Sequence, residues 1–72
     1  MEEKHHKELT AIGLKIMFYR KQQGLTQLQL AEMTSYSRNH IQQIETAKAV
    51  PGLIALLDIA KALNIPVTKL FE

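Results

Sequence analysis

The chain of 72 residues contains no cysteine, and its two prolines both come late, at Pro51 and Pro66. Without cysteine it can form no disulfide and no thiolate metal site, and it lacks a cysteine nucleophile. No apolar run approaches the roughly 20 residues that a membrane-spanning helix needs. Residues 1–8 also lack the apolar core of a signal peptide. The sequence therefore predicts a soluble, cytoplasmic protein that makes no contact with a membrane.

The residues that catalysis or ligand binding would need are missing as well. The acidic residues form no evident pair or metal set, and no nucleophile can be matched with a base and an orienting group. No glycine-rich loop is present to cradle a phosphate. His5 and His6 could suggest a metal site, but neighbouring residues on a flexible arm make a poor chelate. We therefore predict a flexible arm over residues 1–8, and no enzymatic activity, cofactor, metal or small-molecule substrate.

The formal net charge of +2 permits a nucleic-acid partner without indicating one strongly. Residues 1–8 carry three Glu and two Lys, which leaves a net +3 on residues 9–72. A chain of this length is near the lower limit at which one core folds alone. We expect residues 9–72 to form one domain, with a second copy of the chain as further support.

The hydrophobic pattern predicts an all-α domain of five short helices and no strand. Leu9, Ile12, Ile16 and Tyr19 recur at steps of three and four residues, which marks the buried stripe of a first helix. Gly24 is expected to end this helix in the left-handed conformation. The other four helices are expected at about residues 27–34, 38–45, 53–63 and 66–71.

Capping residues mark the starts of the second and third helices. Thr26 with Gln29 three residues later is typical of a capping box, and Ser37 is the next N-cap. Only residues 34–36 separate these two helices, too few for a relaxed antiparallel hairpin. A link this tight favours two helices that cross at a large angle, which is the helix-turn-helix arrangement.

The third predicted helix has an outer face made of polar side chains with several hydrogen-bonding groups. Ile41 and Ile44 must turn inward, so the residues between and before them point outward. This outer face consists of Arg38, Asn39, Gln42 and Gln43. A guanidinium can bind guanine and a carboxamide can bind adenine, each adding roughly 1–3 kcal/mol of discrimination between bases. The free amides that follow Ser37 suit a phosphate.

An ordinary solvated helix face is the alternative interpretation, and such faces are commoner among proteins at large. They usually alternate Glu and Lys, whereas this face has neither before Glu45. Together with the tight turn, this composition favours base readout. His40 lies on the same helix, but its phase places it beside the second helix, so we interpret it as a packing residue rather than a DNA contact.

Residues 12–71 resemble the Cro/cI-like (XRE) phage-repressor helix-turn-helix family. The matching residues are Ile12-Gly13, Lys15-Ile16, Arg20, Gly24-Leu25-Thr26-Gln27, Leu30-Ala31, Ser37-Arg38-Asn39, Ile41, Ile44-Glu45, Pro51, Leu53, Ile59-Ala60, Ala62-Leu63 and Leu70-Phe71. Taken together these motifs are specific, and they extend over most of the chain. The resemblance implies a compact domain of five helices that binds double-stranded DNA.

The resemblance also implies roles for individual residues. Gln27 is expected to meet a phosphate, and Arg38, Asn39 and Gln43 to meet bases, while Gln42 occupies a position of variable role. The resemblance further implies that Arg20 pairs with Glu45 and so holds the third helix at its reading angle.

Three positions depart from the family pattern. Ser35 stands where glycine is common in the turn, so we expect it to adopt a positive φ at some energetic cost. Ala47 also stands at a frequent glycine position. The link after the third helix offers only Lys48 as a basic group for phosphate, which predicts weak or salt-sensitive DNA binding.

The fourth predicted helix carries more apolar surface than one buried stripe can use. Only Asp58 and Lys61 are charged between residues 53 and 63. We predict a homodimer interface that includes Ile54, Leu57 and Ile65. The alternative is closer packing of the fourth and fifth helices within one monomer.

The first predicted helix has a second apolar strip, formed by Leu14, Met17 and Phe18. We expect Leu70 and Phe71 at the end of the chain to pack against this strip. A contact site for another protein is the alternative.

These features predict a sequence-specific DNA-binding transcriptional regulator, a repressor that acts as a homodimer on two half-sites about one helical turn apart. The alternative is a protein-interaction module of the same fold, such as an antitoxin or a partner of another regulator. Prophage, plasmid, restriction-modification and antitoxin contexts all agree with the sequence.

Overall fold

The computed structural model describes residues 3–72, and every regular element within them is helical. No strand occurs in this part of the chain, in agreement with the predicted all-α class. None of its helices is both long and apolar enough to cross a lipid bilayer. The elements are η1 (Glu3–His5), α1 (His6–Gln22), α2 (Gln27–Glu32), α3 (Arg38–Glu45), α4 (Leu53–Ala62) and η2 (Val67–Phe71).

The prediction of five helices is confirmed only in part. Residues 3–72 contain four α-helices, and the fifth predicted helix is the 3-10 helix η2. Pro66 lies before η2 as its N-cap, and its carbonyl accepts a hydrogen bond from the amide of Lys69 at 3.0 Å. The five residues of η2 follow a proline and include the buried Leu70, and they form the tighter i to i+3 pattern that short helical segments commonly adopt.

The start of α1 also differs from the sequence expectation. The helix begins at His6 and follows directly on η1, so residues 6–8 belong to its first turn. The expected arm over residues 1–8 falls partly on residues 1 and 2, which lie outside the described residues. The division into an arm and a domain over residues 9–72 stays a prediction.

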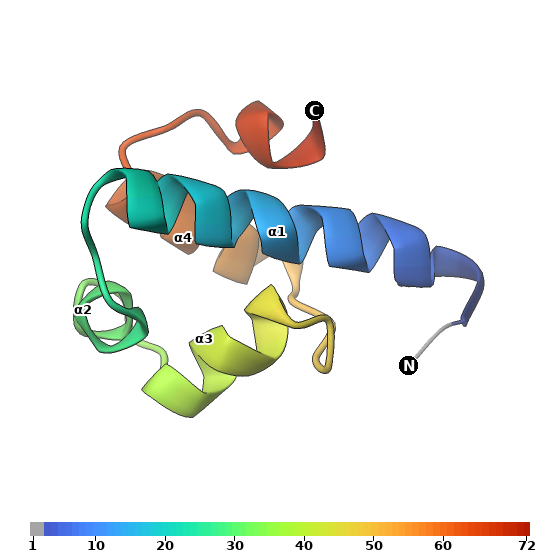
Figure 1. Ribbon diagram of the computed structural model, residues 1–72, viewed down its shortest axis with the longest axis horizontal. Coiled ribbons are helices and arrows are strands. Elements are labelled where there is room, and N and C mark those ends of the chain that lie inside the picture. The colour runs from blue at the N-terminus through green and yellow to red at the C-terminus, as the bar shows by residue number, and fades with distance from the viewer. Residues whose placement is uncertain (1–2) are drawn as a thin grey trace.

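The longest helix, α1, runs along the molecule between η2 on one side and α3 on the other, with α4 behind it (Figure 1). α2 lies beside the C-terminal end of α1 and leads into α3 through a short turn. Side chains from all four α-helices and η2 meet in one core. Its buried members are Ile16, Leu30, Ala31, Ile41, Ile44, Leu56, Ile59, Ala60, Leu63 and Leu70.

Three of the four α-helices end in the same way, with one residue in the left-handed conformation. These residues are Gly24 after α1, Ala47 after α3 and Asn64 after α4, with φ values of 72°, 59° and 57°. In each case the next amide donates to a carbonyl five residues earlier, as in the bond of 2.8 Å from Lys48 to Gln43. The predicted role of Gly24 is confirmed, and Ala47 performs the same role with a side chain less suited to it.

The expected positive φ at Ser35 was wrong, because the described non-glycine residues with positive φ are Ala47 and Asn64. The hydroxyl of Thr34 explains how the turn closes without a left-handed residue. It donates to the carbonyl of Ala31 at 3.0 Å and accepts from the amide of Tyr36 at 3.2 Å. These two hydrogen bonds hold the turn between α2 and α3 with ordinary backbone angles.

The expected cover for the second apolar strip of α1 is incomplete. Leu70 is buried, but it packs into the main core, and Phe71 stays largely exposed. Leu14 and Phe18 remain 55% and 57% exposed. The prediction that Leu70 and Phe71 pack against this strip was therefore wrong. Of these two side chains only Leu70 is buried, and it contributes to the main core.

Candidate nucleic-acid interface

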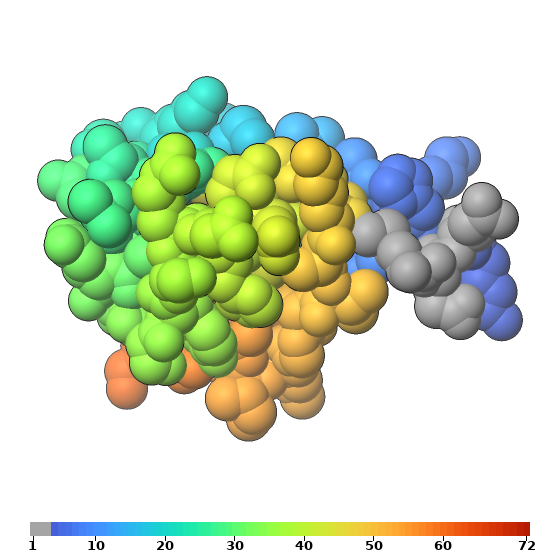
Figure 2. Space-filling view, turned by 90° about the horizontal axis from the view of Figure 1, so that it is seen from below, coloured from blue at the N-terminus to red at the C-terminus, as the bar shows by residue number. Residues whose placement is uncertain are grey.

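The exposed side of α3 forms the centre of one face of the molecule. Figure 2 looks onto this face, with α3 in yellow-green, α2 in green to one side and the link toward α4 in gold to the other. Arg38 and Asn39 are exposed, and Gln42 and Gln43 are half-buried along the same helix. Ile41 and Ile44 are fully enclosed in the core. The helix therefore carries its polar groups outward.

The C-terminal end of α3 is fixed by a buried ion pair. Nε of Arg20 donates to Oε2 of Glu45 at 2.6 Å, and a terminal nitrogen of the same guanidinium donates to Oε1 at 3.0 Å. Arg20 and Glu45 are only 7% and 2% exposed. A third guanidinium nitrogen donates to the carbonyl of Leu25 at 2.8 Å. This bidentate geometry ties α1, the loop after it and α3 together.

Gln27 joins the same cluster from the start of α2. Its side-chain amide donates to Oε1 of Glu45 at 3.0 Å, so the Glu45 carboxylate accepts three hydrogen bonds from two other helices. The family resemblance implied a phosphate contact for Gln27 and did not indicate this link. Gln27, the expected phosphate-binding residue, is therefore hydrogen-bonded directly to the last residue of α3.

Gly13 lets the backbone of α1 lie directly against the end of α3. A Cβ atom at this position would lie 2.5 Å from the carbonyl oxygen of Glu45 and 2.7 Å from that of Ile44. Contacts this short are excluded for any larger residue unless the helices move apart. In the sequence Gly13 was visible only as part of the family resemblance, because nothing local marks it as a contact residue.

The N-terminal end of α3 is capped and open to solvent. The hydroxyl of Ser37 accepts from the amide of His40 at 3.0 Å, as its N-cap role predicted. The hydroxyl leaves the amides of Arg38 and Asn39 at the solvent side of the first turn, where helix amides have no partner within the helix. The structure thus presents two forked side chains and two backbone donors at one end of the helix.

Tyr36 and His40 pack against each other beside the N-terminal end of α3. Their rings stack with centroids 5.4 Å apart, so His40 packs against a residue of the link between α2 and α3. The Tyr36 hydroxyl donates to Asp58 on α4 at 3.1 Å. Partial burial of the ring, and then the neighbouring Asp58 carboxylate, raise the pKa of Tyr36 above its ordinary value, so the hydroxyl stays protonated and keeps donating at neutral pH.

The remaining predicted residues fall into two groups. Lys48 is exposed in the link that follows α3. Ile54, Leu57 and Ile65 belong to α4 and the segment after it, which the fold holds behind α1 rather than at the α3 face. The DNA-contact candidates are thus brought together around α3, and the dimer candidates form a separate surface.

Comparison with known proteins places these features in a family. The helix-turn-helix family model matches residues 16–70 of the chain. The immunity repressor protein of Bacillus phage phi105 is 39% identical over 59 residues, which cover 82% of this chain and 41% of that protein. The competence pilus inhibition repressor of Acinetobacter baylyi is 37% identical over 60 residues, covering 83% of this chain and 54% of that protein. The chain thus spans about half the length of these relatives.

Solved structures show the same arrangement of helices. The restriction-modification controller protein C.AhdI from Aeromonas hydrophila superposes with a TM-score of 0.88 at 28% identity, covering 90% of this chain and 98% of that one. The clp gene regulator ClgR from C. glutamicum shares the fold with a TM-score of 0.83 at 22% identity, covering 88% and 82%. With the family match and the α3 geometry, these findings show that the chain belongs to the helix-turn-helix family of DNA-binding transcriptional regulators.

Proposed function

We propose that this domain represses transcription by reading a specific DNA sequence with α3, and that it does so as a homodimer. The observation that carries the proposal is the outer face of α3. Its forked donors, Arg38 and Asn39, are exposed, and no ion pair within residues 3–72 engages Arg38. A guanidinium and a carboxamide on one rigid helix are the groups that recognise guanine and adenine in the major groove.

Three flanking residues supply phosphate contacts in this proposal. Ser37 marks the helix end whose free amides face solvent, Lys48 provides an exposed positive charge, and Gln27 lies beside Glu45. Contacts of this kind set the register of a protein on DNA without reading sequence. Because few cations take part, specific binding depends mainly on base contacts and on the pairing of two domains.

The repressor role is taken from the relatives. Both curated proteins are repressors by name, and C.AhdI is a restriction-modification controller. Neither repressor is matched over its full length, so the proposal concerns the DNA-reading domain and not the other segments of those proteins. A domain that covers an operator blocks transcription without any catalytic group.

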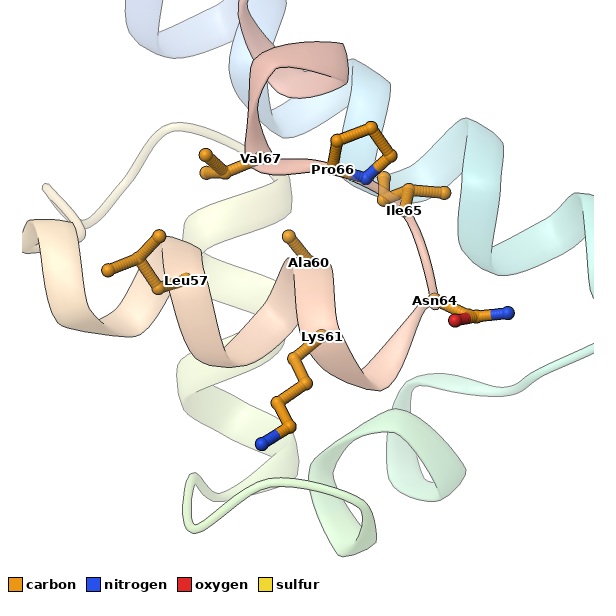
Figure 3. Close-up of a pocket in the computed structure, with 7 residues that line it drawn as sticks. All are labelled: Leu57, Ala60, Lys61, Asn64, Ile65, Pro66 and Val67. Atoms are coloured by element: carbon orange, nitrogen blue, oxygen red, sulfur yellow. The ribbon is translucent and has the colours of Figure 1, made fainter.

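Dimer formation is supported by the apolar surface of α4. Ile54 is 67% exposed and protrudes one turn before a hollow of about 460 Å³. Figure 3 shows that this hollow lies between α4 and the segment that follows it, with Leu57, Ala60, Ile65 and Val67 among its lining residues. In a two-fold pair, Ile54 of each copy fills the hollow of the other, which is the self-complementary contact that such symmetry requires.

Selection of bound sequences from a random duplex pool tests the DNA reading. We expect one enriched motif with two half-sites related by symmetry. Arg38→Ala and Asn39→Ala should each weaken binding to that motif by roughly 1–3 kcal/mol, with an unchanged melting temperature. Lys21→Ala on α1 is the matched control, because it removes a positive charge away from α3. Loss of binding in the control alone, or in no variant, contradicts base readout by α3.

Sedimentation equilibrium tests the dimer separately. We expect a dimer for the wild-type chain and a monomer for Ile54→Asp, because two carboxylates would then be buried in apolar contacts. Leu28→Asp is the control, since Leu28, like Ile54, is a large aliphatic side chain that is more than half exposed, but it lies on α2. A monomeric wild-type chain at micromolar concentration would remove the dimer and leave the α3 proposal standing.

A further inference from the structure

The solvent side of α1 carries an apolar strip that neither the core nor the α3 face uses. Ala11, Leu14 and Phe18 follow one another at steps of three and four residues, so they lie in one line along the helix. Leu14 and Phe18 are more than half exposed. The ring of Phe18 packs edge-on against Tyr19 with centroids 5.1 Å apart, which holds it in place.

A shallow depression lies along the strip. Ala11, Leu14, Lys15 and Phe18 line about 350 Å³ of it, and Ala11 has the smallest of these side chains. A second, smaller depression of about 130 Å³ also reaches Ala11, between α1 and η2. A depression next to a small side chain suits the side chain of another helix, inserted as a knob into a hole.

Lysines surround this strip on α1. At 100° per residue, Lys15 and Lys21 fall on opposite sides of the line through Leu14 and Phe18, and Lys7 falls at its N-terminal end. No ion pair within the described residues includes any of these lysines. The acidic side chains near the strip are Glu8 and Glu72, and Glu72 lies 3.5 Å from the ammonium group of Lys69. Lys7, Lys15, Lys21 and Lys69 outnumber these two carboxylates, so the surroundings of the strip carry a net positive charge.

We propose that this strip binds an amphipathic helix of another protein, with apolar residues along its centre and glutamate or aspartate on both sides. The positions of Lys7, Ala11, Leu14, Phe18 and Lys21 repeat in steps of four and three, the spacing of a helix-to-helix seam. Apolar side chains of the partner fill the depression at Ala11, and its carboxylates pair with the lysines. Opposite charges around an apolar centre determine which partner binds and at what rate.

Two other occupants fit this surface less well. A second copy of α1 would bring the same lysines against each other, since an antiparallel pair places Lys7 of one helix near Lys21 of the other. An anionic lipid surface would meet the lysines, but insertion into lipid needs a broad apolar face, and Leu14 and Phe18 are the large apolar side chains of α1 that are more than half exposed. The charge and the narrow apolar area together favour an acidic helix.

Binding to α1 does not compete with DNA in this proposal. α1 crosses the front of the molecule in Figure 1 with α3 below it, and the core side of α1, which includes Ile16 and Arg20, is the side that faces away from the strip. A partner seated on the strip therefore leaves Arg38 and Asn39 exposed. Such a partner could be brought to the DNA by the domain while it remains bound.

Two synthetic peptides of roughly 18 residues, about five helical turns, test the proposal by fluorescence anisotropy. Both carry the same leucine seam, one with glutamate and the other with lysine on its flanks. We expect saturable binding of the acidic peptide that weakens with salt, and binding of the basic peptide at least about tenfold weaker. Equal affinities for the two peptides, or no binding of the acidic one, would overturn the proposal.

Variants of the protein locate the contact. Leu14→Ala and Lys15→Glu should each weaken binding of the acidic peptide about tenfold or more, as expected for residues at the centre of a helix contact. Leu28→Ala is the matched control, because Leu28 is 51% exposed against 55% for Leu14 and lies on α2. Circular dichroism checks that each variant is folded. An equal effect of Leu14→Ala and Leu28→Ala would overturn the assignment to α1.

Three further measurements distinguish the other occupants. Phosphatidylserine vesicles that capture the protein through Leu14, while the acidic peptide does not bind, would overturn the proposal in favour of a lipid surface. A change of oligomeric state in Leu14→Ala would overturn it in favour of a second copy. Operator binding by Leu14→Ala should equal that of the wild type, and a loss would show that the strip serves DNA binding instead.

Discussion

The two ends of α3 differ in burial, charge and contacts, although the whole helix is only eight residues long. At the C-terminal end Glu45 is enclosed, accepts hydrogen bonds from Arg20 and Gln27, and lies against the backbone of Gly13. At the N-terminal end Arg38 and Asn39 are exposed. We therefore expect the stability of the domain to depend on the C-terminal end of α3, and the proposed reading of DNA to depend on its N-terminal end.

The largest effect should follow from removing the buried carboxylate. Glu45→Ala leaves the Arg20 guanidinium buried without its partner, and breaking such a pair typically costs about 3–5 kcal/mol. That is a large share of the roughly 5–15 kcal/mol that holds a typical domain folded. Urea denaturation followed by circular dichroism should show a much lower midpoint, or an unfolded chain at 25 °C.

Arg38→Ala is the control at the opposite end of the helix. Because Arg38 is exposed and outside every ion pair of the described residues, its loss should change the free energy of unfolding by less than about 0.5 kcal/mol. Comparable losses of stability in Glu45→Ala and Arg38→Ala would contradict the division between the two ends.

The second prediction concerns the close contact between α1 and α3. Gly13→Ala should destabilise the domain by about 1–3 kcal/mol, because the new methyl group would overlap backbone atoms that can move only with the whole helix. We also expect DNA binding to weaken by more than the smaller fraction of folded protein explains. The reason is that α1 can make room for the new methyl group only by shifting α3. Thermal unfolding and operator binding of the same variant measure both effects.

Gly52→Ala provides the control for the glycine substitution. A Cβ at Gly52 meets no atom within 4 Å, so only its N-cap preference should change. If Gly13→Ala proves no more destabilising than Gly52→Ala, the contact with the end of α3 is not tight in solution.

Much of the recognition helix could be predicted because its boundaries are local. Thr26 and Ser37 cap the helices through hydrogen bonds within one turn, and the spacing of Ile41 and Ile44 determines which side of α3 faces the core. These relations extend over three or four residues, so the pattern of residue types contains them.

The contacts that hold α3 in place were less accessible to sequence reasoning. The close approach of Gly13 joins residues more than 30 positions apart and depends on how two helices pack. The link from Gln27 to Glu45 likewise appears only once α2 and α3 are placed side by side. The expected strain at Ser35 was wrong for a related reason, since the hydroxyl of Thr34 provides the turn with hydrogen bonds that residue preferences do not reveal.

The smallest predicted effect concerns the residue that closes the C-terminal end of α3. Ala47 has a φ of 59° and is 3% exposed, so its left-handed backbone carries a penalty of roughly 1–2 kcal/mol while its methyl group is buried. In Ala47→Gly the penalty disappears, but the unfolded chain gains freedom and the methyl contact is lost. We expect a net stabilisation of about 0.5 kcal/mol, measured as a higher melting temperature.

Gly24→Ala is the reciprocal test, because Gly24 ends α1 with the same hydrogen bonds and a φ of 72°. A methyl group at Gly24 meets no atom within 4 Å, so it adds the left-handed penalty without any packing gain, and the melting temperature should fall. If Ala47→Gly also lowers the melting temperature, the buried methyl group outweighs the backbone penalty. The end of α3 would then be held by packing around Ala47 as well as by the carboxylate of Glu45, which would deepen the contrast with its exposed N-terminal end.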